Sequence, residues 1–180
     1  GMGALEHVVA TPSPGQAWQE AILAYRETFD RFPRSQAAEQ SLLQWGRLLA
    51  EQDDYLNATE RFGVLIDRYP SSQGVQQARL EQGVSFQKWA VWEKDPARRR
   101  EIQLSGTKPL WDIPLNKPQA PSARVALAKL LSDLERFDDA VSVLDSARSV
   151  ITAPNLLAQA HFQKGLAHFG GKRYVTSITE

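Results

Sequence analysis

The segment GRLLAEQDDYLNATERFGVLIDRYP, residues 46–70, carries the pattern that decides the fold. Gly46 lies in an apolar run with helical spacing, a small Ala58 follows twelve residues later, and Phe62 follows four residues after that. Two helices that cross closely need small side chains at the crossing and a large one beside it. Glycine inside a helix costs about 1 kcal/mol relative to alanine, so close packing is the use we expect for Gly46. The segment therefore predicts two antiparallel helices that end before Pro70.

The same pattern recurs along the chain. The stretch RFPRS at residues 31–35 precedes RYPSS at residues 68–72 by 37 residues, and a fixed spacing of this size is typical of stacked repeats. Small residues that match Gly46 or Ala58, and large residues that match Phe62, occur at Ala21, Tyr25, Gly83, Ala128, Ala140, Leu144 and Gly165. The sequence thus predicts several copies of one helix pair, with close crossings at Gly46, Gly83, Ala128 and Gly165.

This pattern resembles the tetratricopeptide repeat, a helix–turn–helix unit of about 34 residues. The second unit, about 39–71, matches the family pattern best, through Gly46, Ala58, Phe62 and Pro70. The resemblance implies an all-α fold, an α-solenoid of antiparallel helix hairpins. We expect helices at 16–32, 36–51, 55–69, 74–94, 122–135, 138–151 and 155–170, with another beginning near 173.

The 37-residue spacing of the repeats is interrupted at residues 95–121. This stretch holds five prolines and Gly106, and it separates Gly83 from Ala128 by 45 residues instead of 37. We therefore expect an irregular insert near 95–121 and no normal second helix in the third unit.

Both ends of the chain carry predictions as well. Residues 1–15 read as a flexible lead, with Gly1 left over from a cleaved tag, and 16–180 as a single repeat domain. Gly170–Gly171 suggests a turn between helices. The last unit is incomplete, so either more chain follows in the native protein or another subunit covers its exposed face, which would make a homo-oligomer.

Composition limits the possible functions. The 180 residues include 42% hydrophobic residues, carry a formal net charge of +0 and contain no cysteine. The balance of charges gives no overall attraction to nucleic acid or to an anionic membrane. The absence of cysteine excludes disulfides, thiolate metal sites and cysteine nucleophiles. No apolar run approaches the ~20 residues that span a bilayer, so we expect no direct membrane insertion.

No group of residues predicts catalysis. His161 and His168 are two helical turns apart, which suits a structural or surface role better than a metal site. The carboxylate pairs Asp53–Asp54 and Asp138–Asp139 occupy matched positions before second helices, where we expect them to cap free amides. The sequence therefore predicts no catalytic, cofactor-binding or metal-binding residue, and no enzyme.

The resemblance implies a binding function instead. In this family the first helices line a concave groove that holds a peptide of a partner protein. Carried over position by position, the lining is mixed apolar, amide and basic: Gln40, Leu43, Arg47, Gln77, Leu80, Gln87, Lys88, Val125, Lys129, Gln159 and Phe162. Such a lining suits a peptide backbone with an occasional acidic side chain.

Two further predictions rest on short motifs. Arg98, Arg99 and Arg100, with Trp111, offer a second contact, or in the alternative reading a site for nucleic acid or a phosphate ligand. The hairpin endings DRFPRS and DRYPSS resemble those of bacterial cell-envelope repeat proteins, of the outer-membrane assembly lipoprotein and Tol–Pal-associated types. That resemblance implies a periplasmic scaffold; a cytoplasmic adaptor is the alternative.

Overall fold

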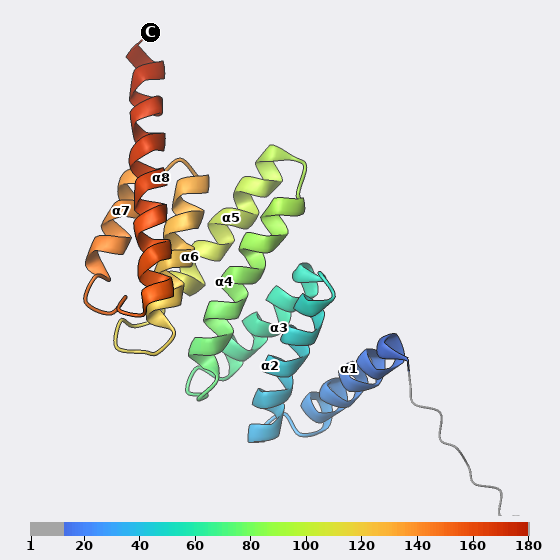
Figure 1. Ribbon diagram of the computed structural model, residues 1–180. Helices are drawn as coiled ribbons and strands as arrows, with labels where there is room; N and C mark the ends of the chain where they lie inside the picture. Colours follow the sequence, from blue (N-terminus) through green and yellow to red (C-terminus); the bar gives the residue numbers. More distant parts are fainter. Residues whose placement is uncertain (1–12, 180) are drawn as a thin grey trace, which may run out of the picture.

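The chain folds into helices joined by short loops. The computed structural model describes the backbone of residues 13–179 and the side chains of residues 13–172, and within them there is no strand. The helices are α1 Pro14–Arg31, α2 Gln36–Glu51, α3 Tyr55–Arg68, α4 Val75–Trp92, α5 Pro96–Trp111, α6 Ala120–Asp133, α7 Phe137–Ser146 and α8 Pro154–Thr179 (Figure 1). The predicted all-α solenoid of hairpins is confirmed.

Short polar residues set several helix starts. Ser35 accepts a hydrogen bond from the amide of Ala38 at the start of α2, and Asp54 accepts one from the amide of Asn57 at the start of α3. The capping role predicted for the first carboxylate pair is thus confirmed at Asp54. It is wrong for Asp138–Asp139, which lie inside the first turn of α7 and favour its dipole without capping it.

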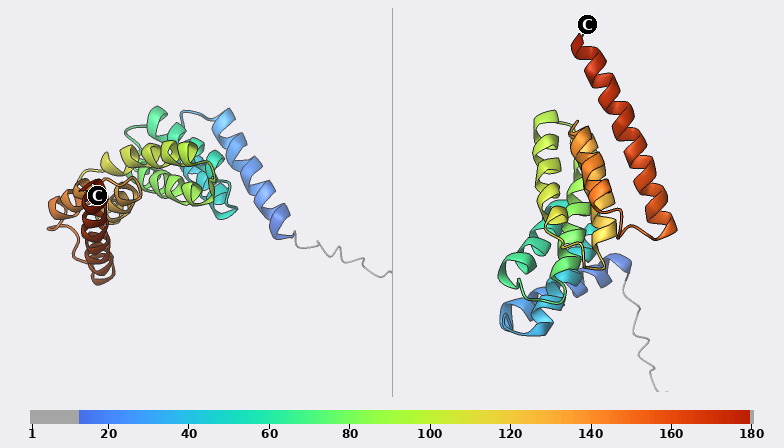
Figure 2. Two further views of the ribbon diagram at one scale, coloured as in Figure 1. Left: turned by 90° about the horizontal axis from the view of Figure 1, so that it is seen from above. Right: turned by 90° about the vertical axis from the view of Figure 1, so that its left-hand side faces the viewer.

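Contacts between helices explain the shape of the molecule. Each helix packs on its neighbours in the chain, and the first helices α2, α4, α6 and α8 also contact one another in succession. The second helices α3, α5 and α7, as described, make no contact with each other. The stack is therefore tighter on the side of the first helices, which bends it into the arc seen from above in Figure 2.

The predicted close crossings carry this packing. A Cβ atom built on Gly46 would lie 2.5 Å from the ring of Phe62, which is fully buried. A Cβ on Gly83 would lie 2.3 Å from Leu110, and Ala128 is also fully buried. At these three sites the small residue is what lets two helices approach.

The fourth predicted crossing is wrong. Gly165 lies on an exposed face of α8 with no atom within 4 Å of the position of a Cβ. The turn predicted at Gly170–Gly171 is also wrong, because α8 continues through both glycines. A Cβ on Gly170 would lie 2.4 Å from the ring of Phe137, so this glycine permits a close contact with α7 and makes no bend.

The irregular insert predicted near 95–121 is largely an ordinary second helix. α5 spans residues 96–111, and only 112–119 form a loop. Pro96 occupies the first turn, where proline is tolerated. Pro109 lies inside the helix, where it removes one backbone hydrogen bond, and α5 ends two residues later at Trp111. The extra eight residues lengthen α4, α5 and the loop after α5.

The predicted flexible lead, 1–15, overlaps the start of the fold. Residues 1–12 lie outside the described residues, as does Gly1, and α1 already begins at Pro14. Ser13 caps α1 by a reciprocal exchange with Gln16, whose backbone amide donates to the Ser13 hydroxyl while its side chain accepts from the Ser13 amide.

Candidate functional site

A polar network runs along the first helices. Arg47 of α2 donates to both carboxylate oxygens of Glu81 on α4, with its Nε at 2.9 and 3.0 Å and one terminal nitrogen at 2.6 Å. Gln77 donates to the same carboxylate at 2.8 Å and accepts from Gln119, next to the start of α6, at 3.2 Å. Three successive repeats are therefore tied together by side chains on the inner side of the arc.

This network changes the electrostatics predicted for the groove. The hydrogen bonds from Arg47 to Glu81 raise the pKa of the guanidinium, although partial burial opposes the shift. Lys129, another of the three cations assigned to the groove, pairs with Asp133 at 3.0 Å. Both charges are neutralised within the chain, so the groove offers amide and apolar groups more than free positive charge.

The remaining groove candidates differ in accessibility. Leu43 and Leu80 are half-buried, because each packs against a core cluster while part of its side chain stays at the surface. The exposed candidates are Gln40, Lys88, Gln159 and Phe162, and half-buried Gln87 lies 3.5 Å from the carbonyl oxygen of Ala126. Val125 is only 7% exposed, so the prediction that it lines the groove is wrong.

The residues assigned to a second contact do not come together. Arg98 and Trp111 lie at opposite ends of α5, about 20 Å apart along its axis. Arg98 pairs with Glu93 at 3.3 Å, and Arg99 donates to the carbonyl oxygen of Glu93 at 2.8 Å. Arg100 is exposed on the same turn. The geometry thus does not join Trp111 to the three arginines in one surface of the kind that binds single-stranded nucleic acid.

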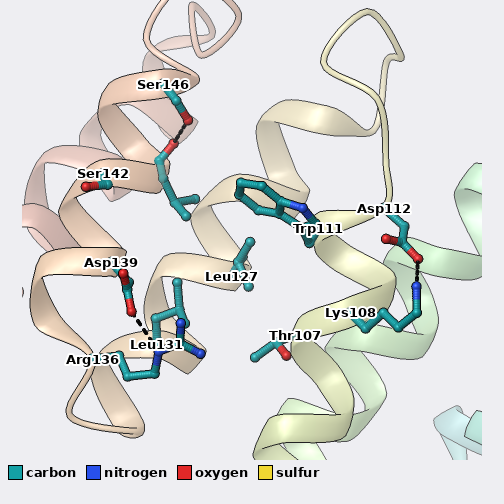
Figure 3. Close-up of a pocket in the computed structure, with 11 residues that line it drawn as sticks. Thr107, Lys108, Trp111, Asp112, Leu127, Leu131, Arg136, Asp139, Ser142 and Ser146 are labelled. Carbon is teal, nitrogen blue, oxygen red and sulfur yellow. Dashed lines mark hydrogen bonds and ion pairs between the residues drawn. The ribbon is translucent and has the colours of Figure 1, made fainter.

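Trp111 instead forms one wall of a pocket that the sequence did not predict. The pocket has a volume of about 600 Å³ and lies between α5, α6 and α7. Figure 3 shows Trp111 directed from α5 toward Ser142 and Ser146 of α7. Leu127 and Leu131 of α6 also line it. Because α5 and α7 do not contact each other, the pocket opens on the outer side of the arc.

A buried arginine holds this end of α5 in place. Arg124 of α6 is only 5% exposed, and it donates to the carbonyl oxygens of Leu110 and Ile113 at 2.7 Å each. Its guanidinium also lies 5.3 Å from the centre of the Trp111 ring. Burial lowers the pKa of Arg124. The hydrogen bonds to the two carbonyl oxygens offset the cost of burying the charged guanidinium. No sequence signal marked this residue, since its partners are backbone atoms.

Comparison with known proteins agrees with this architecture. Residues 40–72 match the family model of the tetratricopeptide repeat. The matched segment is similar to one tetratricopeptide repeat. The match covers the α2–α3 hairpin, with the close crossing of Gly46 and Phe62. No curated protein matches the chain. Tetratricopeptide repeats generally mediate protein–protein interaction and are generally non-catalytic.

One structural finding bears on the membrane. None of the helices that the structure describes is both long and apolar enough to cross a lipid bilayer.

Proposed function

We propose that this protein is a non-catalytic scaffold that binds a segment of a partner protein in the groove lined by α2, α4, α6 and α8. The observation that carries the proposal is the network of Arg47, Gln77 and Glu81, which fixes the first helices of adjacent repeats relative to one another. A groove held in place before binding loses less entropy when it takes up a peptide.

The lining indicates the chemistry of the partner. Leu43, Leu80 and Phe162 supply apolar surface, and the glutamines supply donors and acceptors for a peptide backbone. With Arg47 and Lys129 paired inside the chain, an acidic partner side chain is best met by Lys88, which is exposed. We therefore propose an extended or helical segment with apolar anchors and little net charge.

A matched pair of substitutions tests the groove. Leu43→Glu places a charge on the inner side of α2, and Leu56→Glu places the same charge on α3, where Leu56 is 46% exposed. Partners captured from an extract of the source organism are identified by mass spectrometry, and their affinity for each variant is then measured. We expect Leu43→Glu to lose binding and Leu56→Glu to keep it. Unchanged circular dichroism spectra of both variants would show that both are folded. Equal binding by the two variants would contradict it.

We also propose a location in the bacterial cell envelope. What supports this is the repeated hairpin ending DRFPRS and DRYPSS, in which Tyr69 donates a hydrogen bond to the carbonyl oxygen of Pro33 and so joins one ending to the other. Fractionation of the source cells tests it, with recovery in the periplasmic or membrane fraction expected. Recovery only with cytoplasmic markers would favour a cytoplasmic adaptor instead.

A further inference from the structure

The outer pocket lies in a space that recurs between successive second helices. Two residues of the intervening first helix form its floor: the one before the close-crossing residue and the one three after it. These are Trp45 and Leu49 on α2, Gln82 and Phe86 on α4, and Leu127 and Leu131 on α6. The size of these two residues decides how much of the space stays open.

Between α3 and α5, long side chains from α4 occupy this space. Gln82 reaches α3, where its side-chain amide donates to the carbonyl oxygen of Thr59 at 3.0 Å. Phe86 lies against α5, since a Cβ on Gly106 would be 3.0 Å from the Cβ of Phe86. Between α5 and α7 the floor consists of two leucines, which leave the pocket of about 600 Å³. Its volume is within the usual range for small-molecule sites.

The walls of the pocket suit an aromatic ring. Trp111 is 57% exposed, and Figure 3 shows its indole directed across the pocket toward α7. Leu127, Leu131 and Val143 line the pocket with apolar side chains that are almost fully buried. A planar ring that enters the pocket can stack on the indole and displace water from this apolar floor.

The charges around the pocket leave one positive charge without a counterion. Lys108 pairs with Asp112, which makes one neutral pair in the lining. Arg136 pairs with Asp139, which makes a second. Arg124, next to the indole, donates to two backbone carbonyl oxygens and forms no ion pair with any residue that the structure describes. Its guanidinium is poorly screened because the residue is only 5% exposed, so its field reaches the pocket.

Arg136 is the group best placed to receive a negative charge. Its Nε donates to Asp139 at 2.7 Å, whereas its terminal nitrogens form no hydrogen bond within the described part of the chain. Figure 3 shows these nitrogens on the side that faces Thr107 of α5. About half of each side chain of the ion pair is exposed, so rearranging the pair to admit a ligand costs little. A guanidinium with two free terminal nitrogens can hold a carboxylate through two hydrogen bonds.

We propose that this pocket binds a small aromatic carboxylate. The ring stacks on Trp111, and the carboxylate accepts hydrogen bonds from Arg136. A single negative charge matches the one excess positive charge of Arg124, which favours a monoanion over a dianion or a cation. The pocket opens on the outer side of the arc, so it is separate from the groove proposed for the partner protein.

Matched acids and amides test this chemistry. Phenylacetate, cinnamate and naphthoate each join an aromatic ring to one carboxylate, and phenylacetamide, cinnamamide and naphthamide are their neutral equivalents. NMR titration of the full chain should show that at least one acid binds, about tenfold more tightly than its amide, because the amide cannot form the charge-assisted hydrogen bonds. No binding by any of the three acids, or equal binding of each acid and its amide, would overturn the proposal.

The tryptophan indole N–H resonances locate the site. The chain has five tryptophans, and the resonance of Trp111 is the one that disappears in Trp111→Phe. The bound acid should shift this resonance and leave that of Trp18 unchanged, because Trp18 is on α1, at the other end of the molecule (Figure 1). An acid that binds without shifting the Trp111 resonance binds elsewhere, and that result would also overturn the proposal.

Two variants fill the pocket and a third removes its anchor. Leu131→Phe places on α6 the residue that α4 has at the equivalent position, and Ser142→Phe fills the pocket from an exposed position on α7. Each should weaken binding of the acid at least about tenfold. Arg136→Gln should weaken the acid about tenfold and leave the amide unchanged. The control is Arg148→Gln, which removes the same charge outside the pocket and should bind the acid normally.

Circular dichroism of each variant checks that it is folded. Undiminished binding of the acid by both filled variants, or by Arg136→Gln, would contradict the proposed site. None of these measurements involves the partner groove, so the failure of one proposal leaves the other standing.

Discussion

Replacing Gly46 with alanine should destabilise the protein, although alanine is the better helix former. The new Cβ would lie 2.5 Å from one ring carbon of Phe62 and 2.8 Å from two others. The ring is fully buried, so it can move only by displacing its neighbours. Overpacking of this kind costs about 1–3 kcal/mol, and the gain in helix propensity returns about 1 kcal/mol. We expect a net loss of about 1 kcal/mol in the free energy of unfolding.

Gly165→Ala is the matched control. It gives the same gain in helix propensity, and its Cβ meets no atom within 4 Å, so this variant should gain up to about 1 kcal/mol. Urea unfolding followed by far-ultraviolet circular dichroism measures both, with the slope of the transition checked for two-state behaviour. In a Phe62→Leu background the cost of Gly46→Ala should largely disappear. If Gly46→Ala were as stable as Gly165→Ala, the reasoning about close crossings would be refuted.

Three further predictions concern other parts of the structure. Arg124→Met should lower the free energy of unfolding by about 2–4 kcal/mol, measured by urea unfolding, because it leaves two buried carbonyls without a donor; a change within 0.5 kcal/mol would contradict the anchoring role. The hydrogen bond to Asp53 raises the pKa of Tyr55 to about 12, so its stabilisation is present below pH ~10 and is lost as the pH rises through about 12. Asp53→Ala should lower the tyrosinate absorbance midpoint of Tyr55, and an unchanged midpoint would exclude that cause. Glu81→Gln should speed amide hydrogen exchange in α2 and α4 by loosening Arg47, whereas unchanged exchange would show that the network does not hold the repeats.

The sequence predicted the hairpins where a local pattern reports packing directly. Gly46 and Phe62 meet as the spacing required, and Ala58 is fully buried beside them. Gly165 lies in a helix, as the spacing predicted, but no other helix packs against it. The spacing places a residue on one face of a helix and does not show whether another helix covers that face. The prediction for Val125 has the converse problem: it was expected at the groove surface, and its face of α6 is covered, which leaves the side chain only 7% exposed.

The second helix of the third repeat, α5, was not predicted, because the prolines of this stretch were given more weight than its small-to-large residue step. Gly106 precedes Leu110 by four residues, the same small-to-large step as in the second repeat, and both are buried against α4 or α6. Pro96 falls in the first turn of α5, which tolerates proline, and Pro109 lies only two residues before the end of α5; composition does not reveal either position.

The candidate site was only partly predictable. Arg47 was placed in the groove, but its neutralisation by Glu81, 34 residues away, depends on how two repeats stack. The outer pocket depends in the same way on α5 and α7 standing apart, which no local pattern encodes.

The central claim is that close helix crossings build the solenoid. The most direct test is an engineered disulfide across the crossing of α4 and α5, where Gly83 meets Leu110. Leu110 Cγ lies 2.3 Å from the position of a Cβ on Gly83, which puts the two Cβ atoms within about 4 Å, the range of a disulfide. The chain has no cysteine of its own, so Gly83→Cys with Leu110→Cys can be compared with Gly83→Cys with Leu104→Cys, at an exposed site on the same helix. Under mild oxidation we predict an intramolecular disulfide in the first double variant and none in the second. No disulfide in the first, or equal formation in both, would contradict a solenoid built on close helix crossings.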